Sequence, residues 1–461
     1  MNEYLQQVLN SVRGLFGGSR DKAMEQVQKL TRQTMIARAF AFFNGFMPKQ
    51  LQVKAGEPDD NIAINYASVI VDKGVAFLFG QPLVLSIGTD EDKRGEEFIE
   101  RVWSQAQRDE EFQEMAEDGA ISGDAYLKIN IEPDGTPRVT VGDPNTYQII
   151  TDQHDVARIV KFICSYQLDG DSKPYLFKEE TVRAGDGKSW QIDQYVSYDG
   201  GKVWTPLADK SVKWNFSFPP IFHAKNLPNP RCSNGKPDLT EDVLSLIAYI
   251  SRLDSMCGKI VRIHSSPKPY AKNLKKQDLE WGTDGMLFLK PTGTTAEAEI
   301  KLLEMQNDIA TALSLRKVLR EALAEVTGVP EVATGKVETT GQLSGVALRI
   351  LYGPLLDKTS KKQLRYGRMI KECAQALLVI GNLKALTVKL NWPDPLPGDE
   401  KEKVDVAEGK KRLGVSQATL QKELGYDPEH EREQRQFDAQ EVGAGLLDAF
   451  NSGGATEGAI A

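Results

Sequence analysis

Apolar positions recur at helical spacing in two long stretches near the middle of the chain, 239–266 and 307–328. Intervals of three and four residues place such side chains on one face of an α-helix, so the pattern predicts two amphipathic helices. Asp238, with Glu241 three residues later, has the spacing of a capping box at the start of the first helix. A proline shortly after each stretch ends it, because the residue before a proline avoids the helical region.

The segment between these two helices, 267–306, has a different pattern. Three short extended runs are separated by polar residues, glycine and proline: 269–274, 286–289 and 299–303. The sequence therefore predicts a small β module between two long helices. An ordinary helical hairpin that carries an insertion would have the same pattern, and this alternative stays open on these stretches alone.

The N-terminal half alternates between helical and strand periodicity. Helical spacing predicts a first amphipathic helix that ends at Gly17-Gly18, with Leu5, Val8, Leu9, Val12 and Leu15 on one face. Four more helices are predicted at 21–43, 61–79, 95–106 and 109–121. Short extended runs predict strands at 83–86, 122–129, 138–141 and 147–151. Between 158 and 224 the period falls to two, with glycine-containing hairpin turns at 185–187 and 199–201, which predicts an antiparallel β layer.

The chain after the second long helix begins with a polar, glycine-containing stretch, 331–341. A long helix is predicted from Ser344 to Ile380, with a kink at Gly353-Pro354. Its predicted apolar side is Leu348, Leu351, Leu355, Leu364, Ile370, Cys373, Leu377 and Leu378, and its predicted basic side is Lys358, Lys361, Lys362, Arg365 and Arg368. A strand at 387–391 follows. Two shorter helices are then predicted at 400–412 and 417–424, the second capped by Ser416.

This order of elements resembles the portal proteins of tailed bacteriophages, closest to the type found in phages of Gram-positive hosts. The residues that carry the resemblance are Asn65, Val71-Asp72, Gly80-Gln81-Pro82, Ser122-Gly123-Asp124-Ala125-Tyr126, Gly328-Val329-Pro330 and Ser344-Gly345-Val346-Ala347-Leu348. Each motif is short, and their order along the chain is the specific signal.

The resemblance implies a helix-rich α+β fold and a division of the chain into named parts. The stem helices would be 239–266 and 307–328, with the clip, a small α/β module, at 267–306. The wing, with its antiparallel β layer, would be 1–238 and 329–398, and would include a tunnel loop at 331–343 and the long helix at 344–380. The helical crown would be 399–442, and the small-residue-rich tail, 443–461, would be disordered.

The resemblance also implies a function. A portal is a ring, of about twelve copies, at one vertex of the capsid, through which double-stranded DNA is packaged and ejected. Its implied partners are the large subunit of terminase (the packaging ATPase), a head–tail adaptor, and the major capsid and scaffolding proteins. We expect such a protein in the virion, after synthesis in the cytoplasm of the infected bacterium.

Composition narrows the class of protein. The 461 residues are enough for two to four domains, and neither a signal peptide nor a membrane span is predicted. A formal net charge of −8 argues against a tight, sequence-independent DNA binder, which normally carries a basic face. The four cysteines, Cys164, Cys232, Cys257 and Cys373, form no C-x-x-C pair, so a zinc site has no support.

Motifs for catalysis are absent from the sequence. Gly187-Lys188-Ser189 matches the end of a P-loop, but Val182 stands where the first glycine is needed. There is no H-E-x-x-H and no G-x-S-x-G, and paired acids such as Asp59-Asp60 are typical of solvated faces. We therefore expect no enzyme, no cofactor and no metal, and energy for any packaging would come from a partner.

Two groups of residues are the candidate functional sites. In the tunnel loop, Lys336 would contact phosphate, Glu338 would limit the strength of that contact, and Thr339 and Thr340 would line the channel. In the clip, the residues predicted to dock partners are Lys268, Tyr270, Lys272, Lys275, Lys276 and Trp281. The alternative for both is an ordinary solvated loop. For the whole chain the alternatives are a non-portal oligomeric structural or scaffold protein of a virion, and an enzyme with an unrecognised site.

Overall fold

The computed structural model describes residues 20–420 and 432, except for 89–92, 170–172, 266–268, 273–278, 282–286, 290–298, 303–308, 335–344, 384–385, 397–399 and 418. The chain divides into two compact units, residues 1–342 with 350–395, and residues 343–349 with 396–461. The helices are α2 (Arg20–Phe43), α3 (Tyr66–Phe79), α4 (Arg94–Val102), α5 (Gln105–Ser122), α6 (Glu241–Ser265), α7 (Ile309–Thr327), α8 (Gly345–Leu351), α9 (Gly353–Ile380) and α10 (Glu400–Arg412).

The strands of the first unit pair into antiparallel sheets, which makes the fold α+β as predicted. One sheet has the order β10-β2-β3, from Ile221–Lys225, Asp124–Ile131 and Pro137–Gly142. A larger sheet has the order β4-β5-β6-β7-β8, with β9 paired to β7; its strands are Tyr147–Thr151, Ile159–Leu168, Tyr175–Arg183, Trp190–Ser197, Thr205–Pro206 and Val212–Trp214. β1 (Val84–Ile87) pairs with β15 (Val388–Asn391) although about 300 residues separate them in sequence.

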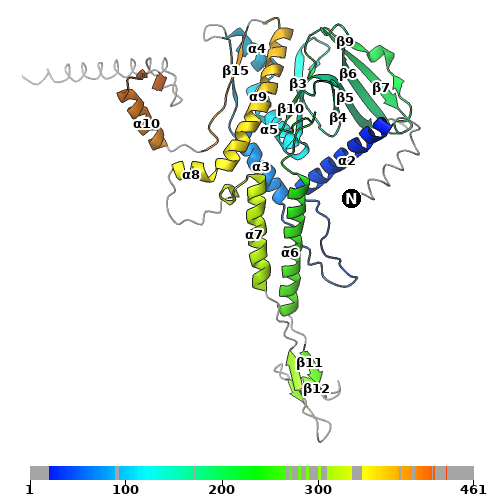
Figure 1. Cartoon of the computed structure of the whole chain (residues 1–461), viewed down its shortest axis with the longest axis vertical. Helices are drawn as coiled ribbons and strands as arrows, with labels where there is room; N and C mark the ends of the chain where they lie inside the picture. The colour runs from blue at the N-terminus through cyan, green and yellow to red at the C-terminus, as the bar shows by residue number, and fades with distance from the viewer. Residues whose placement is uncertain are drawn as a thin grey trace, which may run out of the picture. The chain divides into compact units, whose positions relative to one another are not determined.

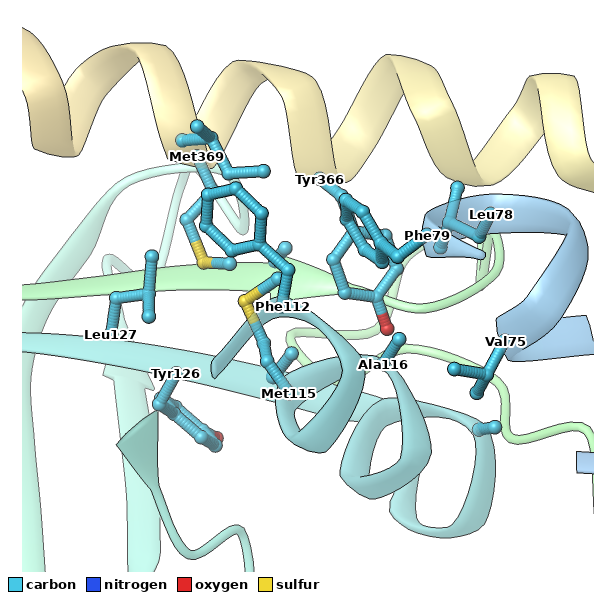
Figure 2. Close-up of a cluster of buried hydrophobic side chains, with 14 of the residues drawn as sticks. Val75, Leu78, Phe79, Phe112, Met115, Ala116, Tyr126, Leu127, Tyr366 and Met369 are labelled. Atoms are coloured by element: carbon cyan, nitrogen blue, oxygen red, sulfur yellow. The ribbon is translucent and has the colours of Figure 1, made fainter. Parts of the chain in front are cut away.

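The main hydrophobic core lies where α3, α5 and α9 meet strand β2. Figure 2 shows Phe79 of α3, Phe112 and Met115 of α5, and Tyr366 of α9 converging in this space. The helices approach closely at Gly119, where an added Cβ would lie 1.9 Å from the Tyr366 hydroxyl. Close packing of this kind excludes water and fixes α9 against α5.

Helix α3 begins at Tyr66, later than the predicted start at residue 61. Asn65 caps it, because its side chain accepts a hydrogen bond from the Ser68 backbone N–H at 3.0 Å. The residues before it serve another contact: the Ile62 N–H donates to the Ser255 hydroxyl of α6 at 2.9 Å. The apolar periodicity was right, and the cap decided where the helix starts.

The helix predicted at 344–380 with a kink at Gly353-Pro354 is divided there into two helices, α8 and α9. α8 ends at Leu351 and α9 begins at Gly353, with Pro354 in its first turn, where proline's missing N–H costs nothing. The predicted apolar and basic sides of this helix were each wrong at one residue or more. Leu364, assigned to the apolar side, is 76% exposed, whereas Lys362, assigned to the basic side, is 2% exposed.

Helices α6 and α7 lie side by side as an antiparallel hairpin, here called the stem hairpin (Figure 1). Their bounds agree with the two predicted helices to within two residues. The segment between them contains four described strands instead of three. β11 (Pro269–Lys272) pairs with β14 (Glu299–Leu302), and β12 (Leu279–Trp281), which was not predicted, pairs with β13 (Leu287–Leu289). β12 has the sequence Leu-Glu-Trp, in which an acidic residue interrupts the apolar run, whereas its partner β13 is the continuous apolar run Leu-Phe-Leu.

The second unit contains α10, which has the predicted bounds. Lys410, Lys411 and Arg412 occupy its last turn, where cations complement the helix dipole. Ser416 caps the next turn as predicted, since its hydroxyl accepts from the Thr419 N–H at 3.3 Å. The remainder of that predicted helix, and the tail at 443–461, lie outside the described residues. Among the helices described, none is long and apolar enough to cross a membrane.

Candidate functional site

The predicted site residues fall mostly where the structure gives no description. Lys336, Glu338, Thr339 and Thr340 of the tunnel loop lie outside the described residues. The same holds for Lys268, Lys275 and Lys276 of the clip. Tyr270 and Lys272 belong to β11 and Trp281 to β12, but only their backbone is described. The structure instead defines the stem hairpin and its attachment to the body, on which both predicted sites depend.

A partly buried ion pair joins the two helices of the stem hairpin. Arg316 of α7 donates through two nitrogens to the Asp254 carboxylate of α6, with an Nη2–Oδ2 distance of 3.2 Å. The hydrogen bonds to Asp254 stabilise the charged guanidinium, so they raise the pKa of Arg316. Bidentate arginine–carboxylate pairs fix both distance and orientation, so this pair sets the register of α6 against α7.

A second ion pair ties the far part of α6 to the segment that precedes α3. The Arg262 guanidinium donates to both Asp60 oxygens, at 2.7 and 2.6 Å. Its hydrogen bonds lower the pKa of Asp60. The pair is largely exposed, and solvent screens exposed ion pairs, so it adds little to the stability of the fold. Its role is therefore to orient the loop along α6.

The base of the stem hairpin is held by an ion cluster in which Asp238 and Lys362 are buried and Lys358 is partly buried. The Asp238 carboxylate, just before α6, accepts from Lys362 Nζ at 2.6 Å and lies 3.2 Å from Lys358 Nζ. Asn226 Nδ2 donates to it at 3.1 Å. Lys358 Nζ also donates to the Thr327 carbonyl at the end of α7, at 2.8 Å. One lysine of α9 thus links the end of α7 to the start of α6.

Burial and charge oppose each other in this cluster. Burial by itself would raise the pKa of Asp238, but the ammonium groups of Lys362 and Lys358 lower it on balance. Burial likewise lowers the pKa of Lys362, which the Asp238 carboxylate counteracts. A buried charge of this kind is stable only while its partner and hydrogen bonds are present. The predicted capping box was therefore wrong: Asp238 binds α9, and the first helical hydrogen bond runs from the Leu244 N–H to the Thr240 carbonyl.

The chain leaves α7 through a tightly defined turn. Gly328 has a φ of +68°, a conformation that favours glycine, and Val329 is buried. A short 3-10 helix, η3 (Glu331–Thr334), follows, and Glu331 pairs with Arg320 of α7 at 2.7 Å. η3 therefore forms the first four residues of the predicted tunnel loop, 331–343, and its contact with α7 fixes the start of that loop.

A second buried carboxylate organises the strand side of the body. Asp124, at the start of β2, accepts hydrogen bonds from Arg32 of α2 and from Asn234 and the Gly235 N–H of the connector before α6. His223 of β10 lies 2.7 Å from it. Arg32 thus pairs through its guanidinium with a carboxylate buried in the body.

The stem hairpin carries exposed apolar side chains that no described part of the chain covers. On α7 they follow helical spacing: Leu315 (42% exposed), Val318 (59%) and Val326 (54%). On α6, Tyr249 and Met256 are similarly exposed. They do not coincide with Leu319 and Leu323, which face the body. An apolar stripe on a helix marks a surface that another helix covers.

Reactive groups are few among the described residues. No cluster of histidine, cysteine and acidic residues suited to a metal ion occurs among them. Burial raises the pKa of the Cys164 and Cys373 thiols, which makes them poor nucleophiles. Gly187 and Lys188 of the P-loop-like triplet lie in the turn between β6 and β7, as predicted.

The sequence signals missed the buried clusters for a physical reason. Asp238 and Lys362 are 124 residues apart, and each alone has the pattern of a surface residue. Asp124 is the exception, because it lies in the Ser122–Tyr126 motif, which the sequence alone indicates.

Comparisons with known proteins agree with this architecture. Residues 44–443 match the family model for "Phage portal protein, SPP1 Gp6-like". No curated protein sequence matches the chain. Among solved structures, a chain from the virion of the native gene transfer agent particle is similar with a TM-score of 0.50 and 13% identity, covering 85% of this chain and 94% of that chain.

A second similar structure is a chain from the neck of the empty gene transfer agent particle, computed with C6 symmetry. Its TM-score is 0.49 at 13% identity, with the same coverage of 85% and 94%. At 13% identity, the likeness to the virion chain, whose TM-score is 0.50, is one of fold. The family match is broader evidence, since it spans both stem helices, the segment between them and α9. The chain therefore belongs to the phage portal protein family of the SPP1 Gp6-like type.

Proposed function

We propose that this protein assembles into a ring, of about twelve copies, that forms the conduit for double-stranded DNA at one vertex of the capsid. The observation that carries the proposal is the pair of exposed apolar stripes on the stem hairpin, in a chain of the portal family. In the virion the ring would also adjoin the major capsid protein and, during assembly, the scaffolding protein.

The apolar stripes on α6 and α7 suit a closed ring because they are two different surfaces of the same chain. A surface on α6 and another on α7 can meet head to tail between neighbouring subunits, and a repeated head-to-tail contact closes when its rotation divides the circle. Leu315 and Val318 are about half exposed, so covering the rest of each side chain with a neighbour would stabilise the interface by roughly 1 kcal/mol per side chain, about half the value for full burial. The ion pair between Arg316 and Asp254 keeps the two stripes in a fixed relation.

A conduit for DNA needs weak contact with its cargo. A chain with a formal net charge of −8 repels the phosphate backbone overall, and a few lysines repeated around a ring can offset this locally. We assign that role to the tunnel loop at 331–343, with Lys336 as the phosphate contact and Glu338 limiting its strength. The turn at Gly328, together with η3 in the first residues of the loop, fixes where the loop leaves α7, and this supports the assignment.

The clip, 267–306, is proposed as the docking site for the terminase large subunit and later for the head–tail adaptor. Its position between the two stem helices supports this role, because the hairpin would present it at one end of the ring. Lys268, Tyr270, Lys272, Lys275, Lys276 and Trp281 supply the basic and aromatic side chains that are common at protein interfaces. ATP hydrolysis is assigned to the partner.

The test is the oligomeric state of the purified full-length chain. We expect negative-stain images at micromolar concentration to show rings with a central channel, and mass photometry to show one large species. Leu315→Glu with Val318→Glu should shift the protein to monomers and small oligomers. Lys317→Glu, which makes the same change in net charge on another face of α7, should still form rings.

Two results would count against the proposal. Wild-type protein that stays monomeric or dimeric would remove the ring, and with it the conduit. Large oligomers without a channel would favour the alternative, a non-portal scaffold or structural protein of the virion.

A further inference from the structure

The first unit carries a basic groove that the stem hairpin and tunnel loop do not explain. The groove has a volume of about 650 Å³ and lies between α9, β10 and the larger sheet. Its floor is apolar, with Phe162, Trp190 and Met369. Five cations line it: Arg158, Arg183, Lys225, Arg365 and Arg368.

Positive charge in this groove is not balanced locally. Among the described residues that line it, Glu372 is the one acid, and it is already paired with Arg368 at 2.8 Å. The Arg183 Nε is buried without a partner among the described residues. In a chain that is acidic overall, such a concentration of cations favours an anionic occupant.

The acidic counterpart lies on helix α5. Glu114 is exposed, and Glu117 and Asp118 are half-buried on the same helix, near Asp143 at the end of β3. Burial, and then the charges of Asp143, Glu114 and Glu117, raise the pKa of Asp118 to about 7. Burial and the neighbouring charges of Asp72 and Glu114 also raise the pKa of Glu117. Carboxylates that repel one another in this way would gain from an approaching cation.

The two surfaces lie on opposite flanks of the same layer. In the sheet order β10-β2-β3, β10 and β3 are the two edges. The groove is built on β10 and α9, whereas the acidic surface is on α5 and the end of β3. Tyr366 of α9 points toward α5, as Figure 2 shows, while Arg365 and Arg368 line the groove on another side of α9. A molecule with complementary surfaces on opposite flanks is suited to head-to-tail association.

We propose that the α5 acidic surface of one subunit docks in the α9–β10 basic groove of the next subunit in the ring. The inference rests on the proposed ring and adds a second, electrostatic contact to that of the stem hairpin. The occupant is a second copy of this chain because the matching charges are present on the same molecule. DNA suits the groove less well, because its apolar floor cannot contact a phosphate backbone.

The test is a charge swap in the full-length chain. Arg158→Glu with Arg365→Glu, or Glu114→Lys with Glu117→Lys, should each raise the concentration needed for half-maximal ring formation at least tenfold at 0.15 M salt. The combination of all four changes should restore it to within threefold of wild type. Lys173→Glu with Lys202→Glu is an equal change of charge at exposed positions near the opposite end of β6 and β7 from Arg183 and Trp190, and it should have no effect. Circular dichroism would establish that each variant is folded.

The outcomes separate this contact from the ring itself. If wild type forms rings and both reversed variants assemble normally, the groove serves another occupant, an acidic segment of a different protein or DNA, and the inference is wrong. Loss of rings in both variants without recovery in the combination also overturns it, since the two surfaces then do not meet. In either case the ring stands; only failure of wild type to form rings removes both.

Discussion

Asp238 shows how much depends on single buried charges in this protein. Its carboxylate is fully buried, yet it sits at the joint where α6 begins, α7 ends and α9 passes. The charge is kept in place by two lysines and an amide, so the joint is rigid only while all of them are present. Removing one partner of a buried pair leaves the other without compensation, which costs about 3–5 kcal/mol.

The first prediction concerns Lys362. Lys362→Met should destabilise the fold by about 3 kcal/mol, because Asp238 loses its shortest contact and keeps only Lys358 and Asn226. Chemical unfolding at fixed protein concentration measures this change. In the double variant with Asp238→Asn the loss should be smaller than the sum of the two single losses, whereas Lys361→Met, at an exposed position beside it, should be near neutral. Additive losses would show that the two groups do not act as a pair.

The second prediction is the pH dependence caused by Asp118. Its pKa is raised to about 7 in the folded chain from an ordinary value of 3.8, so the folded state binds a proton that the unfolded state has released. Stability should therefore fall as pH rises from about 4 to 7. Asp118→Asn removes this loss, and its gain in stability over wild type should be at least about 1 kcal/mol larger at pH 8 than at pH 5. An equal gain at both pH values would contradict the shift.

At the scale of elements, some residues of the stem hairpin hold its helices in place, and others remain exposed for binding. Arg316 and Asp254 hold α6 to α7, and Ser255 and Arg262 hold α6 to the segment before α3. The apolar stripe on α7 is left free for a neighbouring subunit. The segment between the helices forms its own strand pairs, so it can be exchanged without opening the hairpin.

The third prediction follows from this independence. Replacement of residues 267–306 by a short Gly/Ser linker should abolish terminase-dependent DNA packaging, while rings still form in negative-stain images. A milder variant, Lys275→Glu with Lys276→Glu, should reduce packaging by weakening the basic part of the proposed docking site. Normal packaging by the linker variant would assign terminase docking to another surface.

At the scale of the whole molecule, charge is distributed unevenly in a chain that is acidic overall. The formal net charge is −8, yet cations gather in the α9–β10 groove and carboxylates along α5. This separation favours ordered head-to-tail contact between copies over random association. It also leaves DNA with few strong contacts, as a conduit requires.

The fourth prediction concerns the assembled ring and its cargo. Lys336→Glu should still form rings but should change the amount of DNA packaged or retained, because it reverses a charge repeated once per subunit around the channel. Screening over about 8–10 Å at physiological salt keeps such contacts short-ranged, so the effect should diminish as salt rises. Lys336→Arg, which keeps the charge, is the matched control. Packaging and retention equal to wild type at every salt concentration would leave the loop without this role.

The spacing of apolar residues and the positions of proline and glycine were enough to predict most helices and strands, and their order, from the sequence alone. Helical periodicity and prolines predicted α6 and α7 to within two residues, and period-two alternation with glycine turns predicted the larger sheet. These signals depend on residues close together in the sequence, so they can be recognised without knowledge of the fold. The order of the motifs then indicated the portal family, which the match over 44–443 confirmed.

Only the tertiary structure decided which side chains meet. The pairs Asp238–Lys362 and Arg32–Asp124 join residues 124 and 92 positions apart, and no local pattern distinguishes such residues from solvated ones. Leu364 and Lys362 exchanged their expected environments because burial depends on what packs against α9, and its own spacing does not specify that. The basic groove likewise exists only because α9 and two sheets meet, since its five cations come from four separate places in the sequence.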